Sequence, residues 1–164
     1  MAFTREQAYA ALASLNPAQV FLDSYRIRRL PENLDIYFRP PEEFFLAGDS
    51  QEPYTRNSRF VPILDDGNFG VVTFLNPETR ELVQIDVEAP GETRATFRHW
   101  QQYLADLMIQ VGEVVEEDES VRRIGRLIGF DHTDALFAYY ARTEGLSGDA
   151  WWEERRQFPL SIPG

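Results

Sequence analysis

The sequence predicts an α+β fold: an antiparallel β-meander sheet packed by helices on one side, with a helical C-terminal extension. Three observations predict it: short runs rich in Val, Ile and Phe in the middle of the chain, turn residues between those runs, and helically spaced apolar residues on either side. A chain of 164 residues has the length of one domain with a single core. We expect one domain over 1–164, with a core of about 5–112 and an extension of about 113–164.

The strands are expected at Phe60–Leu64, Phe69–Leu75 and Leu82–Val87. Two turn sequences separate them, Asp65-Asp66-Gly67-Asn68 and the segment NPETR at 76–80. Asp and Asn side chains bond their own backbone and tolerate left-handed geometry, so neither turn requires a metal ion to explain it.

The N-terminal third predicts short helices. Thr4 and Gln7 fit a capping box that opens a helix over 5–15. Asn16-Pro17 predicts a second helix through about residue 25, with Pro17 at its first position. Pro31 suits a third start, which Pro40-Pro41 ends at about Arg39. The polar segment 48–58 is expected to be a loop.

The C-terminal half predicts four helices. Phe97, Trp100, Leu104, Leu107 and Met108 lie at helical spacing, which predicts an amphipathic helix packed on the sheet. After the acidic run 113–119, helices are expected from about Ser120, then after a cap at Asp131 or Thr133 with a stop at Gly145, and finally over GDAWWEERRQFP. The expected sheet–helix core comprises Phe60, Ile63, Val72, Phe74, Val83, Ile85, Phe97, Trp100 and Leu104.

The net charge of the chain limits the kinds of partner that it can bind. The formal net charge is −11, and all 16 basic residues are arginine. Such a chain is repelled by nucleic-acid phosphates and anionic membranes and attracts a basic protein partner, although surplus carboxylates can also serve only solvation. Lysine-based nucleophilic chemistry is excluded. The absence of cysteine, of a signal peptide and of an 18-residue apolar run predicts a cytoplasmic protein.

The sequence lacks the common residue patterns of catalytic and metal-binding sites. A calcium loop starting at Asp66 would place Pro77 where a bidentate glutamate is needed. His99 and His132 lie on different expected helices, and no HExxH, GxSxG or phosphate-loop pattern occurs. We therefore expect no catalytic residue, no metal and no cofactor. The enzyme alternative is a carboxylate-dependent metal hydrolase built on Asp65 and Asp66.

Two adjacent tryptophans, Trp151 and Trp152, stand out near the C-terminus. On a helix their side chains point about 100° apart, so a narrow buried stripe takes only one of them squarely. Both can pack against the C-terminal helices, or one can be exposed as an anchor for a partner.

Three segments carry a resemblance to a known family. The segment LPENLDIYF at 30–38 resembles the LPxx[LY]xxF start of the SMI1/KNR4 (SUKH) superfamily. The segment RFVPILDDGNFGVVTFLNPETRELVQIDVE at 59–88 resembles its central meander, and TFRHWQQYLADLM takes the place of its closing helix. The resemblance covers roughly residues 30–110. Arg80 stands where the family often has glycine, QIDVEAPGE lacks the family's Trp and His, and 111–164 have no counterpart.

The resemblance implies a binding protein without catalytic residues. Bacterial members are mostly immunity proteins that neutralise toxins, many of them nucleases, by direct contact, and fungal members are regulatory scaffolds. We accordingly expect a basic protein partner, such as a secreted nuclease-type toxin, and neither nucleic acid nor membrane. The candidate partner-binding residues are Asp65, Asp66, Glu116, Glu117, Asp118 and Trp151.

Overall fold

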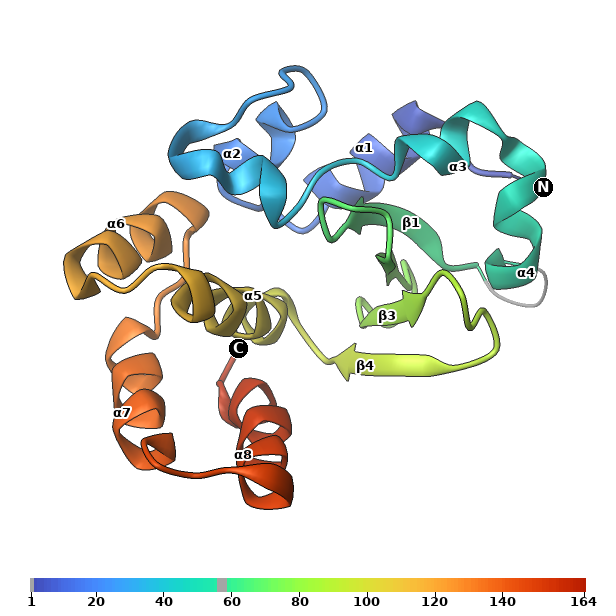
Figure 1. The fold of residues 1–164 in the computed structure, drawn as a ribbon. Helices are drawn as coiled ribbons and strands as arrows, with labels where there is room; N and C mark the ends of the chain where they lie inside the picture. The colour runs from blue at the N-terminus through green and yellow to red at the C-terminus, as the bar shows by residue number, and fades with distance from the viewer. Residues whose placement is uncertain (1, 56–58) are drawn as a thin grey trace. The chain divides into compact units, whose positions relative to one another are not determined.

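The computed structural model of the chain describes residues 2–55 and 59–164 and has an α+β fold (Figure 1). The chain forms two compact units, residues 1–98 and residues 99–164. The long helix that follows the sheet belongs to the second unit.

A four-stranded antiparallel meander forms the centre of the first unit, with the strands in the order β1-β2-β3-β4. The strands are β1 (Val61–Asp65), β2 (Val71–Leu75), β3 (Leu82–Asp86) and β4 (Thr93–Phe97). The three expected strands are confirmed, whereas β4 occupies residues expected to open a helix. Phe97 pairs with Leu82 across the ladder, and this pairing takes Phe97 out of the helical stripe.

One face of the sheet carries a cluster of apolar side chains. Val72 lies opposite Ile85 and Phe74 lies opposite Val83, and Phe44 packs on these four residues. Of the nine expected core residues, seven are buried and two, Phe60 and Trp100, are only partly buried. Every residue of β1 and β2 is buried.

Short helices precede the sheet. They are α1 (Arg5–Ala13), α2 (Gln19–Asp23), the 3₁₀ helix η1 (Pro31–Ile36), α3 (Glu42–Leu46), the 3₁₀ helix η2 (Gly48–Gln51) and α4 (Glu52–Thr55). The capping box at Thr4 is confirmed, since its hydroxyl accepts the Gln7 N–H at 3.2 Å and the Gln7 side chain accepts the Thr4 N–H at 2.8 Å. The second helix begins at Gln19 rather than Pro17, because Ala18 has a non-helical ψ of 147° and serves as the N-cap.

The polar segment 48–58 is helical over 48–55 rather than a loop, and 56–58 lie outside the described residues. The helical part, 48–55, includes Gln51, which is fully buried. The Gln51 side-chain amide donates to the carbonyls of Phe3 at 2.8 Å and Phe44 at 3.1 Å, and its oxygen accepts the Phe3 N–H at 2.8 Å. The pattern of polar residues in this segment cannot predict the bonds to Phe3, because Phe3 lies 48 positions away in the sequence.

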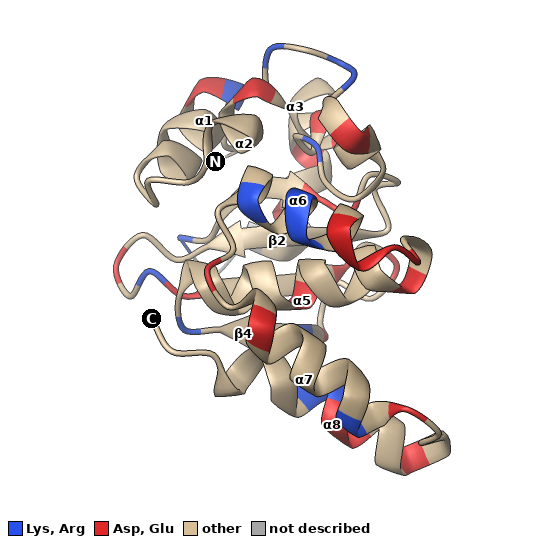
Figure 2. Cartoon of the chain, turned by 90° about the vertical axis from the view of Figure 1, so that its left-hand side faces the viewer, with Lys and Arg blue, Asp and Glu red and all other residues tan. Residues whose placement is uncertain are grey.

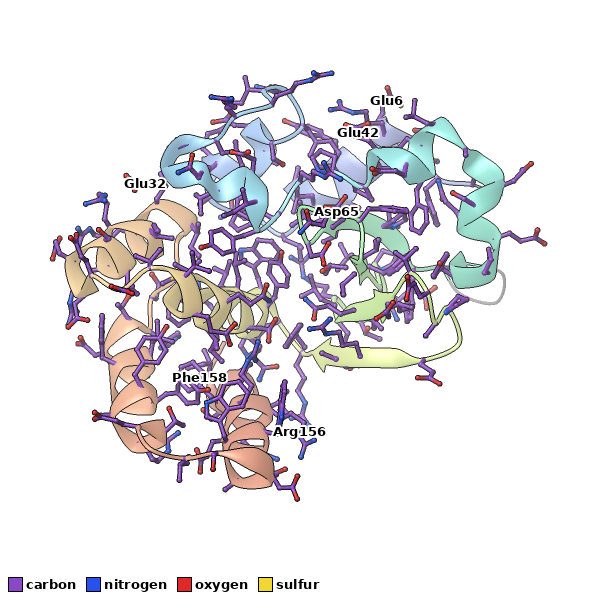
Figure 3. All side chains as sticks on the ribbon, in the orientation of Figure 1. Glu6, Glu32, Glu42, Asp65, Arg156 and Phe158 are labelled. Atoms are coloured by element: carbon purple, nitrogen blue, oxygen red, sulfur yellow. The ribbon has the colours of Figure 1, made fainter. Side chains whose placement is uncertain are left out.

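The second unit is a bundle of α5 (Trp100–Val114), α6 (Asp118–Ile128), α7 (Thr133–Thr143) and α8 (Gly148–Ser161). The helix α5 packs against each of the other three. Phe158 stacks on Tyr139 with ring centroids 4.7 Å apart and points towards α7, whereas Arg156 points away from the bundle (Figure 3). At Gly112 an added Cβ would lie 1.8 Å from the Tyr140 hydroxyl, so a glycine is required where α5 meets α7.

The ends of the C-terminal helices agree in part with expectation. The N-cap of α7 is His132, without a side-chain cap hydrogen bond, rather than Asp131 or Thr133. Gly145 follows the end of α7 in a left-handed conformation, as expected of a helix stop. Among the described residues, no helix combines the length and the apolar character needed to cross a membrane.

Candidate partner-binding surface

Asp65, the first candidate contact residue, is buried at the end of β1 (Figure 3). The side chain is 0% exposed and receives the Arg39 Nε–H, which is 3.3 Å from each carboxylate oxygen. Oδ1 also accepts the Gly67 N–H at 2.6 Å. All these contacts are internal, so the Asp65 side chain is not accessible to a partner in this structure.

The turn after Asp65 is held by its own backbone and by η1. Asp66 Oδ1 accepts the N–H groups of Asn68 at 3.2 Å and Gly70 at 3.0 Å, as expected of a turn aspartate. Gly67 has a φ of 83°, and a Cβ there would lie 2.4 Å from the Ile36 carbonyl oxygen. The half-buried Asp66 remains a candidate for partner contact, while Gly67 serves the packing of the turn on η1.

We expect the free energy of unfolding to depend on pH through Asp65. Burial raises the pKa of this carboxyl from 3.8 to about 7, against the opposing effect of Arg39. Between these two pH values the folded chain keeps a proton that the unfolded chain has lost, so stability falls by about 1.4 kcal/mol per pH unit as the pH rises. Urea unfolding of the wild type and of Asp65→Asn at pH 4.5 to 7.5 measures this.

The difference in unfolding free energy between the two proteins is the quantity to plot, because the other carboxylates titrate in both. Relative to Asp65→Asn, the wild type should lose stability from about pH 4 to about pH 7 and then level off. A difference independent of pH would contradict a buried, proton-holding Asp65.

The acidic candidates of the second unit lie at the start of α6, where Figure 2 shows red ribbon. Glu116, Glu117 and Asp118 are exposed, and none of the three forms an ion pair with a described residue. Within the described part of the chain, the Glu117 carboxylate accepts a hydrogen bond only from the Ser120 hydroxyl, at 3.2 Å. Negative charge near a helix N-terminus interacts favourably with the helix dipole. This interaction offsets part of the repulsion between the three neighbouring carboxylates.

The tryptophan pair lies on α8. Trp151 is half-buried and Trp152 is 56% exposed, and their rings meet edge to face at 4.8 Å. The outer ring is thus supported by the inner one, which fixes its orientation at low entropic cost. The sequence singled out Trp151 as the anchor, whereas the structure makes Trp152 the more accessible of the two.

The candidates therefore fall into separate groups. Asp65 and Asp66 belong to the first unit, and Glu116, Glu117, Asp118 and the tryptophans belong to the second. In the second unit, α6 and α8 each pack on α5, which gives the carboxylates and the tryptophans a common support. In the residues that the structure describes, no three His, Asp or Glu side chains are grouped so as to hold a metal ion.

Comparison with known proteins identifies no relative of this chain. No protein-family model matches the chain, and no match is found among curated proteins or solved structures.

Proposed function

We propose that this chain is a protein-binding module of the SMI1/KNR4 (SUKH) kind, an immunity protein that neutralises a basic, nuclease-type toxin by direct contact. The observation that carries the proposal is a group of exposed carboxylates at the start of α6 that form no ion pair with any residue the structure describes: Glu116, Glu117 and Asp118. Unpaired surface charge of one sign accelerates encounter with a partner of the opposite sign and suppresses encounter with nucleic acid.

The second unit supports this role through its charge and its exposed aromatic residue. It contains 12 acidic side chains and six arginines in 66 residues. Trp152 adds a large, oriented apolar surface on the same bundle. Charges that steer association, together with an aromatic anchor that slows dissociation, are a usual division of labour at protein interfaces.

Replacing Glu116, Glu117 and Asp118 together by Gln, Gln and Asn should slow association with the partner about tenfold and leave folding unchanged. Salt should act in the same direction, because the Debye length falls from over 10 Å to a few Å between about 0.05 and 0.5 M. Surface plasmon resonance against the product of the neighbouring gene measures both effects, and an assay of that product's nuclease activity tests neutralisation.

The matched control removes equal charge from the first unit through Asp49→Asn, Glu88→Gln and Glu92→Gln, three exposed positions. If it slows association as much as the α6 triple variant, net charge rather than this surface governs binding. Trp152→Ala should mainly raise the dissociation rate. Binding that leaves the partner's activity intact would favour the regulatory-scaffold alternative, and an association rate indifferent to salt would overturn the electrostatic surface.

A further inference from the structure

The first unit contains a pocket of about 600 Å³ whose lining is rich in arginine, in a chain of net charge −11. Four arginines line it, and two carboxylates, Asp35 and Glu42, face them. The full lining is Arg5, Ser24, Tyr25, Arg26, Ile27, Arg28, Leu30, Asp35, Phe38, Arg39, Pro40, Glu42 and Leu46. Its volume is within the range of small-molecule sites.

Two of the arginines are held in place by tyrosine rings. The Arg5 guanidinium lies over Tyr25 at 5.2 Å and donates to the Tyr25 carbonyl, and Arg26 lies over Tyr9 at 5.6 Å and donates to its hydroxyl at 2.9 Å. The two rings meet edge to face at 5.6 Å. A guanidinium that is already stacked loses little entropy when it binds a ligand.

The charges of the lining do not cancel. Glu42 is paired with Arg5 at 2.9 Å, and Arg39 is paired with Asp65 and with Glu43. Asp35 accepts the Leu30 N–H at 3.0 Å.

The arginine loop that follows α2 supplies the remaining positive charge, visible as blue ribbon in Figure 2. Arg28 is exposed and makes no ion pair or hydrogen bond with a residue that the structure describes. Among the described residues, the Arg26 side chain donates a hydrogen bond only to the Tyr9 hydroxyl, which is not a carboxylate. The guanidinium groups of Arg26 and Arg28 therefore share the pocket with one carboxylate, Asp35. This carboxylate forms no ion pair with a described residue.

Apart from Ser24 and Tyr25, the uncharged part of the lining is apolar. Leu30, Phe38 and Pro40 are buried in its wall, whereas Ile27 and Leu46 are 49% and 86% exposed. Exposed aliphatic side chains beside unpaired guanidinium groups favour a ligand with an anionic oxygen group and an apolar body.

We propose that this pocket binds a small organic anion, a phosphate or carboxylate carried on an apolar group, with Arg28 and Arg26 on the oxygens and Ile27 and Leu46 against the apolar part. The site is independent of the proposed partner surface, because all of its residues belong to the first unit. Phenyl phosphate and benzoate are suitable probes of the two anion types, with inorganic phosphate and phenol as the separate halves.

Isothermal titration calorimetry on the full chain should show saturable binding of phenyl phosphate or benzoate, and the stronger of the two identifies the anion. Arg28→Gln should weaken that binding about tenfold or more without changing the melting temperature. Arg29→Gln is the matched control, because Arg29 is adjacent, equally charged and exposed but does not line the pocket; its affinity should stay within about twofold of the wild type.

Three outcomes would overturn the proposal. The first is no saturable binding of either aromatic anion up to about 10 mM. The second is equal weakening by Arg28→Gln and Arg29→Gln, which would reduce the effect to general electrostatics. The third is inorganic phosphate or phenol binding as tightly as the whole probe, which would leave one side of the pocket without a role.

Discussion

Phe74→Ala should lower the free energy of unfolding by about 3–5 kcal/mol, a large part of the stability of a domain of this size. Phe74 is fully buried on β2, opposite Val83. Its ring contacts Tyr54 and Phe44, with centroids 6.0 and 6.1 Å apart. Truncation removes these contacts and leaves a cavity that strands paired on both sides cannot close.

Urea unfolding followed by far-UV circular dichroism measures the loss. Leu46→Ala is the control, because this side chain is 86% exposed and its truncation should change stability by less than about 0.5 kcal/mol. If the two variants were equally stable, Phe74 would not hold the centre of the sheet.

Asp106→Ala should destabilise the second unit by about 3–5 kcal/mol, because it leaves Arg155 buried without its main partner. Arg155 Nη1 is 2.7 Å from Asp106 Oδ1, and the two side chains are only 14% and 11% exposed. The second Asp106 oxygen accepts the Gln110 side-chain N–H at 3.0 Å. Glu113 lies 3.9 Å from Arg155 and compensates only in part.

Tryptophan fluorescence during urea unfolding reports on this unit, because all three tryptophans, at positions 100, 151 and 152, lie in it. The double variant Asp106→Leu with Arg155→Met should recover most of the loss, since replacing both charges avoids an unpaired one. Glu119→Gln, which breaks the exposed pair with Arg126, should cost less than about 1 kcal/mol. A cost for Asp106→Ala as small as that would contradict a buried, dependent pair.

Local chemistry explains which parts of the fold the sequence predicted. The three central strands lie between turns whose Asp, Asn and Gly residues act on their own backbone, and those strands were located to within a residue or two. The fourth strand was missed because Phe97 also fits the helical spacing of Trp100 and Leu104. Phe97 belongs to a strand because it pairs with Leu82 of β3, and the local sequence does not reveal this pairing.

The candidate sites show the same limit. Asp65 was expected at the surface because it belongs to a turn, but Arg39, 26 positions earlier in the chain, holds it inside. The arginine pocket had one visible signal, the run RIRR at 26–29, which did not stand out in a chain without lysine. Arg5 and Arg39 join that run only through the tertiary fold.

The constraint at Gly67 determines which positions of this chain can be substituted without disturbing the fold. Its left-handed backbone and its approach to the Ile36 carbonyl exclude side chains at a position that the sequence alone would place in a permissive turn. The glycine at position 67 is therefore a requirement of the fold, whatever Asp66 beside it contacts. Substitutions of the exposed α6 carboxylates, which form the proposed partner surface, should therefore leave the fold intact, whereas any side chain at position 67 should disturb it.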